Sequence, residues 1–496
     1  MSAVHPVDAP LDYEERPRLI VNRDAQTVID EAWRILLSLP DFDRPYQQDR
    51  RLIRVTESGR MNPCGPAEIS AMLYKAARLV RVVKVKKDGA WEEVETPSPC
   101  PPWLDRAMAA IPAATVPELR AVAHAPFLST TGRIIYGRGY HASDRTLLLM
   151  DGEKIPRMTI QEAHDLVNDW LIDYRFQAKS DALNALALWL LPFVRPAISG
   201  PTPAHVVEAS APGSGKGLLA AMLVRPGTGS LPPLSPFSDA EEERRKQIVS
   251  LLAGGRSAII LDNLKGKVDS PTLEAVLTST TWADRMLGTM GEVTIQNRAA
   301  WVMTANNLEL SLDLARRTLR IRLDPGVERP YERTGFIHEN PKWTEDTTPA
   351  LIGAACALIQ DWLDQGRPVP EKLLGSYEEW SRIVGGILTS TLDGTAWLQD
   401  RDDLYRNADR TGDEWREVIE RWGERHGTAR VVASRIIMIA NEFGLVQGTI
   451  GDGGERSQAT RFGAALARQR GRIYGRWRVG AGVRTNEGMA YALEAV

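Results

Sequence analysis

A glycine-rich segment that joins an apolar run to a helix constrains the fold more than any other feature of this sequence. Gly215 and Lys216 match the end of the pattern G-x-x-x-x-G-K-[ST], in which backbone amides surround a phosphate and the lysine supplies a cation. Ser210 replaces the first glycine, and Gly217 replaces the hydroxyl residue that would hold Mg²⁺. The alternative interpretation is a glycine-rich turn with a surface lysine. The residues predicted to bind ATP, together with Mg²⁺, are Pro212, Gly213, Ser214, Gly215, Lys216 and Gly217.

The position of this segment in the chain favours phosphate binding over a plain turn. It follows an apolar run and opens a helix, so free amides and the helix dipole converge on one anion site. After Pro203, short β-like runs alternate with helices, which is the pattern of a parallel sheet with crossover helices. We therefore predict an α/β fold with a P-loop core. Its predicted strands cover residues 205–208, 257–261, 299–304 and 318–323.

A carboxylate follows the second of these runs. Asp262 ends an apolar stretch, the form of a Walker B strand whose aspartate positions Mg²⁺, so it is the predicted metal ligand. A strand-end aspartate that caps a turn is the alternative. Asn263 stands where a glutamate usually polarises the attacking water. Hydrolysis is therefore expected to be slow, or its base to lie elsewhere, for example at Asp269 or Glu274.

Two further polar groups follow the third run and precede the fourth. The third run leads into Asn306, whose amide is predicted to sense the γ-phosphate or water, although asparagines are also frequent in plain turns. Arg316 and Arg317 come just before the last strand and suit an arginine finger that reaches the ATP of a neighbouring subunit. A solvated pair, or a salt bridge to Asp313, is the alternative. The predicted catalytic residues are Lys216, Asp262, Asn263, Asn306, Arg316 and Arg317.

Length and composition set the broader frame. At 496 residues the chain predicts roughly three domains, at about 150 residues each. No apolar stretch is long enough for a membrane span and no signal sequence begins the chain, so we predict a cytoplasmic protein without a membrane partner. The three cysteines lack the spacing of a zinc site. The predicted boundaries are an α+β domain at 1–156, a helical collar at 157–204, the P-loop core at 205–330, a helical domain at 331–426 and a C-terminal domain at 427–496.

The C-terminal domain is basic although the whole chain carries a net charge of -3. Residues 427–496 hold ten arginines against five acidic residues, a formal charge of +5. The pattern of two helices followed by two β-like runs resembles a winged helix, in which the second helix enters the major groove and flanking cations hold phosphates. A winged helix for protein contacts, or a solvated arginine face, is the alternative. The predicted contacts to duplex DNA are Gln458, Arg461, Arg468, Arg476 and Arg478.

Taken together, these segments resemble the AAA+ helicases of phages and integrative mobile elements, similar to the superfamily 3 and poxvirus-type primase-associated helicases. The segments that carry the resemblance are 211–216, 261–263, 284–288, 304–307 and 313–324, so it spans roughly residues 157–345. The resemblance implies a homo-oligomeric ring, usually a hexamer, with ATP sites between subunits and single-stranded DNA in the channel. It also implies a pore hairpin at 288–298, where Arg298 would contact DNA, although the segment lacks a lysine.

The leading functional hypothesis is an ATP-dependent DNA helicase or translocase that acts in replication of a phage or mobile element. The alternative is an ATP-dependent initiator or loader that binds DNA without unwinding it, which slow hydrolysis would permit. A full primase-helicase is disfavoured, because the first 156 residues show neither a zinc-ligand set nor a strand-borne pair of carboxylates for two-metal chemistry.

Overall fold

The computed structural model describes residues 13–49, 51–285, 292–306, 308–399 and 410–496. The chain divides into two compact units, one of residues 1–308 and 317–399 and the other of residues 309–316 and 400–496. Each unit is described by itself below. In the described part of the chain, no helix is both long and apolar enough to cross a bilayer.

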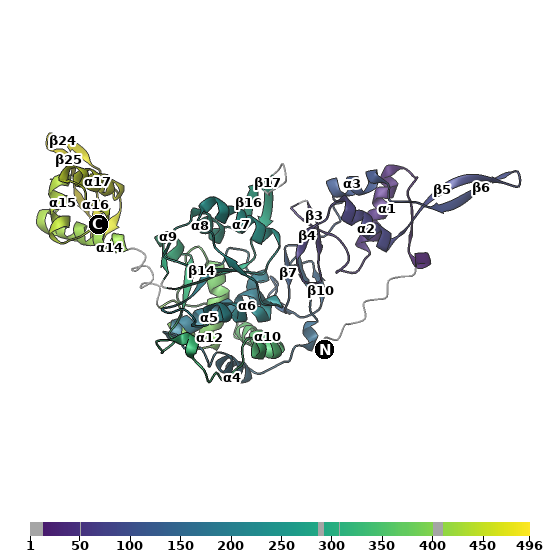
Figure 1. Ribbon diagram of the computed structural model, residues 1–496, viewed down its shortest axis with the longest axis horizontal. Helices are drawn as coiled ribbons and strands as arrows, with labels where there is room; N and C mark the ends of the chain where they lie inside the picture. Colours follow the sequence, from purple (N-terminus) through teal and green to yellow (C-terminus); the bar gives the residue numbers. More distant parts are fainter. Residues whose placement is uncertain (1–12, 50, 286–291, 307, 400–409) are drawn as a thin grey trace. The chain divides into compact units, whose positions relative to one another are not determined.

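The centre of the first unit is a five-stranded parallel sheet with the order β13-β14-β18-β12-β20. Figure 1 labels its strand β14. The predicted α/β class with a parallel sheet is confirmed. Strands β12 and β18 are buried along their length apart from the final Asn306, as expected where helices cover both faces of a parallel sheet. The strands are β12 (Ala204–Ala209), β13 (Leu234–Pro236), β14 (Ala258–Leu264), β18 (Ala300–Asn306) and β20 (Thr318–Leu323).

Helices enclose this sheet, and the apolar helix α5 (Lys179–Val194) lies in the core between the sheet and its neighbours. Because α5 is apolar around most of its circumference, it is buried rather than amphipathic. Trp189 on α5 packs edge to face against Trp170, with ring centroids 5.7 Å apart. The other helices of this layer are α4 (Ile160–Trp170), α6 (Lys216–Thr228), α7 (Glu241–Ala253), α8 (Pro271–Thr278), α10 (Lys342–Asp364), α11 (Glu378–Trp380) and α12 (Gly386–Thr391).

Local signals explain where the collar begins and how it is fixed to the sheet. The capping-box spacing at the start of α4 is confirmed: the Thr159 hydroxyl accepts from the Glu162 amide at 3.2 Å, and the Glu162 carboxylate accepts from the Thr159 amide at 2.7 Å. At the start of α5, the buried Asp181 carboxylate accepts from the Ala178 amide and from Nε of Arg322 on β20.

The N-terminal part of the first unit is a mixture of short strands and helices, as its sequence predicts. A two-stranded hairpin of β5 and β6 extends from it in Figure 1. The helices are α1 (Ala25–Leu37), α2 (Pro66–Ala76) and α3 (Pro102–Ala110), and the strands are β1 (Arg18–Ile20), β2 (Tyr46–Gln48), β3 (Arg51–Val55), β4 (Met61–Pro63), β5 (Arg78–Lys87), β6 (Ala90–Pro97), β7 (Ala121–Ala123), β8 (Phe127–Leu128), β9 (Ile134–Ile135), β10 (Gly139–His141) and β11 (Thr146–Leu148).

The second unit contains β19 (Glu309–Leu310), α9 (Leu312–Ala315) and a C-terminal body with a core of its own. Helix α14 (Arg410–His426) contributes Trp415, Val418, Ile419 and Trp422 to that core. The predicted boundary at 426/427 is therefore wrong, because it separates α14 from the residues on which it packs. The other elements are α15 (Ala433–Glu442), α16 (Gln447–Ile450), α17 (Glu455–Arg468), β21 (Val431–Val432), β22 (Ile473–Tyr474), β23 (Trp477–Val479), β24 (Val483–Thr485), β25 (Gly488–Tyr491) and β26 (Leu493–Ala495).

Candidate functional site

The glycine-rich segment forms the turn between β12 and α6, as predicted. Gly213 and Gly215 have φ angles of +76° and +77°, in the left-handed region that favours glycine. The loop curls around the carbonyl oxygen of Ala211, which accepts from the Ser214 hydroxyl at 2.6 Å and from Lys216 Nζ at 3.3 Å. The turn is therefore a compact loop at the N-terminus of a helix, which is the backbone arrangement of an anion site.

The strand order brings the other predicted groups to the same edge of the sheet. Strand β18 lies between β12 and β14, and its residue Asn306 is opposite Ala209, the last residue before the loop. Asp262 on β14 is opposite Pro236 on β13. Since all five strands run parallel, their carboxyl ends meet at one edge, where open α/β sheets bind ligands.

A hydrogen-bond cluster fixes the end of β14. The Thr304 hydroxyl donates to the Asp262 carboxylate and accepts from the Asn263 amide at 2.9 Å. Asn263 has a φ of +59°, next to a bulge between Leu261 and Leu264. Asparagine tolerates this left-handed conformation better than glutamate. Backbone geometry is thus a physical reason for asparagine at the position where a glutamate usually polarises water.

Sequence reasoning missed Thr304 as a site residue. Its exposed fraction is only 2%, and it ends the apolar run 301–303 one strand away from Asp262. A buried hydroxyl needs a hydrogen-bond partner. Thr304 carries the single hydroxyl in this apolar strand. That hydroxyl could have indicated a polar partner, which is the Asp262 carboxylate.

The charges at this edge are coupled. Burial lowers the pKa of Lys216, while the nearby Asp262 carboxylate acts in the opposite direction. The Asn306 Oδ1 atom is buried, and it accepts a hydrogen bond from none of the residues the structure describes. A cation, a carboxylate, a hydroxyl and an amide oxygen therefore share one site, as nucleotide chemistry with Mg²⁺ requires.

Position 217 faces the same carboxylate. A Cβ atom built on Gly217 would lie 3.9 Å from Asp262 Oδ1 and 3.7 Å from Leu234 Cδ1, both ordinary van der Waals distances. A small side chain at position 217 would therefore fit beside Asp262. Oxygen ligands suit Mg²⁺, which usually keeps several waters and takes one or two carboxylates. The residues present fit such an ion, with Asp262 as its protein ligand.

Two tyrosines that the sequence did not indicate flank the loop. A Cβ atom on Gly213 would lie 2.8 Å from Tyr331 Cβ, and one on Gly215 would lie 3.6 Å from Tyr174 Cε1. Tyr331 belongs to the segment 324–338, which follows β20 and which we call the strap. The Asp173 carboxylate holds the end of the strap by accepting from the amides of Ile337 and His338 at 3.0 and 2.9 Å.

Arg317, one of the two predicted finger residues, does not lie beside the P-loop of its own chain. The carbonyl of Arg317 accepts from the amide of Ala204, at the start of β12 and β20. The loop follows the opposite end of the six-residue strand β12, roughly 20 Å away at about 3.3 Å per residue. Arg316 forms an ion pair with Asp313, the alternative considered for it above.

The predicted pore contact at Arg298 is wrong. Strands β16 (Thr281–Arg285) and β17 (Glu292–Gln296) do form an antiparallel hairpin, whose tip at 286–291 lies outside the described residues, as does Asn307. Arg298 follows this hairpin, is only 9% exposed, and donates to the carbonyls of Ile198 and Arg195. Its guanidinium therefore binds backbone carbonyls inside the unit.

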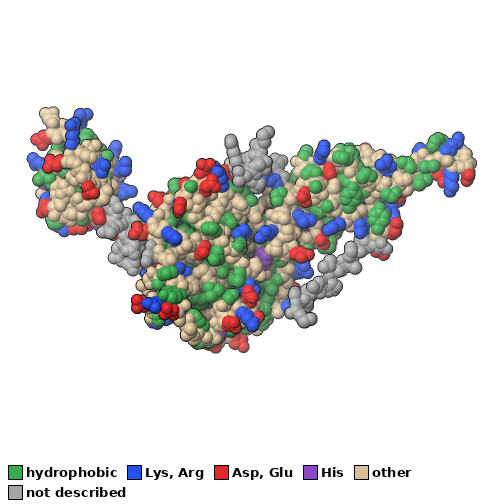
Figure 2. Space-filling view, in the orientation of Figure 1, with side chains coloured by type: hydrophobic (Ala, Val, Ile, Leu, Met, Phe, Trp, Pro, Cys, Tyr) green, Lys and Arg blue, Asp and Glu red, His purple; other side chains and the backbone are tan. Residues whose placement is uncertain are grey.

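The predicted DNA contacts of the C-terminal body are mostly exposed. Arg461 and Arg468 lie on α17, Arg476 lies in the turn between β22 and β23, and Arg478 lies on β23; all four are exposed. Gln458 is half-buried, and its amide donates to the Gly451 carbonyl at 2.9 Å. Figure 2 shows Lys and Arg side chains over the visible face of this body.

No family model matches this chain, and a search of the curated proteins found no match. Solved structures resemble it at low identity. The apo C-terminal region of NrS-1 is 14% identical with a TM-score of 0.35, over 70% of this chain and 80% of that one. A structure described as the SCCmec type IV Cch active helicase is 9% identical with a TM-score of 0.33, over 91% and 97%. The JCV helicase is 16% identical with a TM-score of 0.22, over 51% and 73%. The proposal below therefore rests on the residues of this chain.

Proposed function

We propose that this protein is an ATP-dependent DNA helicase or translocase of the AAA+ kind, active in replication of a phage or mobile element. The observation that carries the proposal is the meeting of Lys216, Asp262, Thr304 and Asn306 at the carboxyl edge of the parallel sheet. In this mechanism the loop amides and Lys216 hold the phosphates of ATP. Asp262 holds Mg²⁺, and Asn306 orients the γ-phosphate or the attacking water.

The proposal also assigns an oligomer. Arg317 lies at the amino edge of the sheet, opposite its own P-loop, so its guanidinium serves a site on a neighbouring subunit. With Arg316 it neutralises charge that develops as the γ-phosphate leaves. In this proposal the subunits form a hexameric ring. ATP binds between neighbouring subunits, and single-stranded DNA passes through the channel. The C-terminal body acts as a winged helix on duplex DNA.

One observation favours a second function. The site has no hydroxyl at position 217 and no carboxylate at position 263, and the left-handed backbone of Asn263 disfavours a longer side chain there. An initiator or loader that needs ATP for assembly, but not rapid hydrolysis, fits these two departures.

Strand displacement on forked DNA separates the two functions. A helicase releases the labelled strand only with hydrolysable ATP, whereas a loader binds the fork in an ATP-dependent manner and leaves it paired. The Lys216→Ala variant should lose the ATP dependence in both cases. Wild-type protein whose DNA binding and fork integrity are both independent of ATP would contradict both functions.

A further inference from the structure

A pocket at the amino edge of the central sheet lies apart from the P-loop. It is a small cavity of about 40 Å³ that is partly open to solvent. Ser257 and Arg298, which precede β14 and β18, form one wall, and Arg120 and Val122 form another. The P-loop follows β12 at the carboxyl edge of the same sheet, so the pocket and the P-loop lie at opposite edges.

Two buried arginines line this pocket. Arg195 and Arg298 are 6% and 9% exposed. The Arg195 guanidinium donates to the carbonyls of Ile198 and Asn297 at 2.8 and 3.1 Å, and Arg298 donates to the carbonyl of Ile198 at 2.8 Å. The Nε atoms of both arginines are buried and have no hydrogen-bond partner. The carbonyls orient both forks without neutralising their charge.

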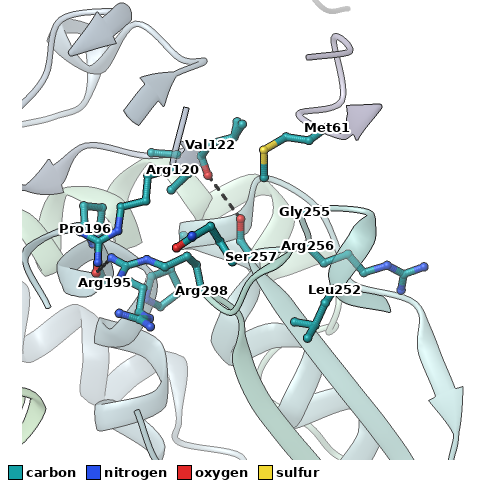
Figure 3. A pocket seen from close by; sticks show the side chains of 15 residues that line it. Met61, Arg120, Val122, Arg195, Pro196, Leu252, Gly255, Arg256, Ser257 and Arg298 are labelled. Carbon is teal, nitrogen blue, oxygen red and sulfur yellow. Dashed lines mark hydrogen bonds between the residues drawn. The ribbon is translucent and has the colours of Figure 1, made fainter. Parts of the chain in front are cut away.

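A third arginine adds to the same positive charge. Figure 3 shows Arg120, Arg195 and Arg298 together on one side of the pocket, while Arg256 extends away from them. Arg120 is half-buried, and its guanidinium donates a long hydrogen bond of 3.5 Å to the Ser199 carbonyl. Its side chain is therefore able to turn toward a ligand.

One carboxylate, Glu379, offsets this charge only in part: burial and Arg120 lower the pKa of Arg195 by more than the attraction of Glu379 raises it. Within the described ranges, none of these three arginines has an acidic group within ion-pair distance. The Glu379 carboxylate accepts from the amides of Ser199 and Gly200 at 2.8 Å, so it attracts the guanidinium groups without forming an ion pair with them. Burial, and then repulsion from Arg120, lower the pKa of Arg195 to about 9, so it is still charged at neutral pH. A buried cluster of like charges is costly unless an anion compensates it.

We propose that this pocket binds the phosphate group of a small molecule, held by Arg120, Arg195 and Arg298. Guanidinium groups donate charge-assisted hydrogen bonds to phosphate oxygens, and backbone carbonyls hold those of Arg195 and Arg298 in place before the ligand arrives. The partly enclosed shape selects a small anion over a nucleic-acid strand. Free phosphate and the phosphate of a mononucleotide share this chemistry.

The test measures stabilisation of the full chain by inorganic phosphate at constant ionic strength. It uses the Lys216→Ala background, so that binding at the P-loop does not contribute. Phosphate should raise the melting temperature of this protein, and adding Arg120→Gln should weaken the apparent affinity by about tenfold, the loss of one charge-assisted contact. Arg256 lines the same pocket, but its side chain extends away from the other three arginines. Arg256→Gln should therefore leave the stabilisation by phosphate unchanged.

The following outcomes decide the proposal. If adenosine monophosphate gives the same Arg120-dependent response at lower concentration, the ligand is a mononucleotide; if only inorganic phosphate does, the ligand is the free ion. The Arg120→Glu variant should lose the phosphate response and melt higher than Arg120→Gln without ligand, because it supplies its own anion. Equal phosphate responses in the Arg120→Gln variant and its parent, or an Arg120 dependence seen only with a single-stranded oligonucleotide, would overturn the proposal.

Discussion

At the residue scale, Gly217 and Asn263 determine what the phosphate site lacks. The neighbours of Gly217 leave room for a side chain, since a Cβ atom there meets Leu234 and Asp262 at ordinary contact distances. The backbone at Asn263, by contrast, is in the left-handed region. The missing hydroxyl is therefore simple to restore by substitution, whereas a carboxylate at 263 would also strain the backbone.

We expect Gly217→Ser to lower the Mg²⁺ concentration that gives half-maximal ATP hydrolysis by about tenfold, or ~1.4 kcal/mol. The reason is that the serine hydroxyl would lie beside Asp262 and help to hold the ion. Gly217→Ala adds the same Cβ atom without the hydroxyl and is the matched control. Mg²⁺ titrations of the ATPase rate measure the difference. Identical Mg²⁺ dependence in the serine and alanine variants would contradict the placement of the metal at Asp262.

The sequence indicated the site residues that lie next to recognisable strands. It did not indicate those that reach the site through long-range contacts. Lys216, Asp262 and Asn306 each follow or precede a recognisable strand, so their convergence followed from the parallel sheet. Tyr331 reaches the loop through the strap, a long-range contact that no local pattern encodes. Arg298 was predicted to contact DNA because the family resemblance implies a pore hairpin at 288–298, whereas here backbone carbonyls hold its side chain inside.

At the scale of the helices and strands, four strands of the central sheet were predictable from the sequence, whereas the edge strand β13 was not. Four predicted runs became β12, β14, β18 and β20 with shifts at their ends, because continuous apolar runs mark buried parallel strands. Strand β13 was missed, since it is three residues long, ends in Pro236 and lies at the edge of the sheet. Proline in a sheet is confined mainly to edge strands. The sequence of β13 therefore resembles that of a loop.

The contact between the P-loop and the strap predicts a specific effect of Gly213→Ala. The added Cβ atom would approach Tyr331 Cβ to 2.8 Å, so either the loop or the strap must move. Gly335→Ala is the control, because Gly335 has the same φ of +76° but no atom within 4 Å. Both variants should lose ~1 kcal/mol from the left-handed backbone. Only Gly213→Ala should weaken ATP binding, by about tenfold or more, in equilibrium titrations. Equal ATP affinities in the two variants would exclude the strap from the site.

At the scale of the whole molecule, the structure divides the chain into two compact units, and the basic domain predicted at 427–496 lies in the second. Charge and glycine content identified a basic C-terminal domain from residue 427, but the amphipathic helix α14 was assigned to the preceding domain. Its apolar face packs on α15 and α17, a choice of partner that periodicity alone does not reveal. Residues of α14 such as Trp415 and Trp422 belong to the second core.

This boundary predicts how truncations behave. A chain ending at Gln399 should stay soluble and bind ATP, but should bind DNA more weakly and with a flatter salt dependence, because fewer phosphate contacts release fewer counterions. A chain ending at His426 keeps α14 without its core and should aggregate, since it exposes Trp415, Val418, Ile419 and Trp422. Light scattering and salt titrations of DNA binding measure these effects. An unchanged salt slope after truncation at Gln399 would assign the C-terminal body to protein contacts.

The proposed finger predicts complementation between subunits. Arg316→Ala with Arg317→Ala should keep ATP binding but lose the hydrolysis that assembly stimulates. Mixing this variant with Lys216→Ala should restore part of the hydrolysis, because some interfaces then pair an intact P-loop with an intact finger. ATPase assays of the separate and mixed proteins measure this. Full activity of the double variant alone, or no recovery on mixing, would contradict action between subunits.

The affinity of the full chain for a non-hydrolysable ATP analogue tests the central claim most directly. Wild-type protein should bind the analogue with Mg²⁺, and Lys216→Ala should abolish binding. Lys246→Ala, which removes an exposed lysine paired with Glu242 and Glu243 on α7, should bind as the wild type does. Unchanged affinity in Lys216→Ala would contradict the assignment of the glycine-rich loop as the nucleotide site.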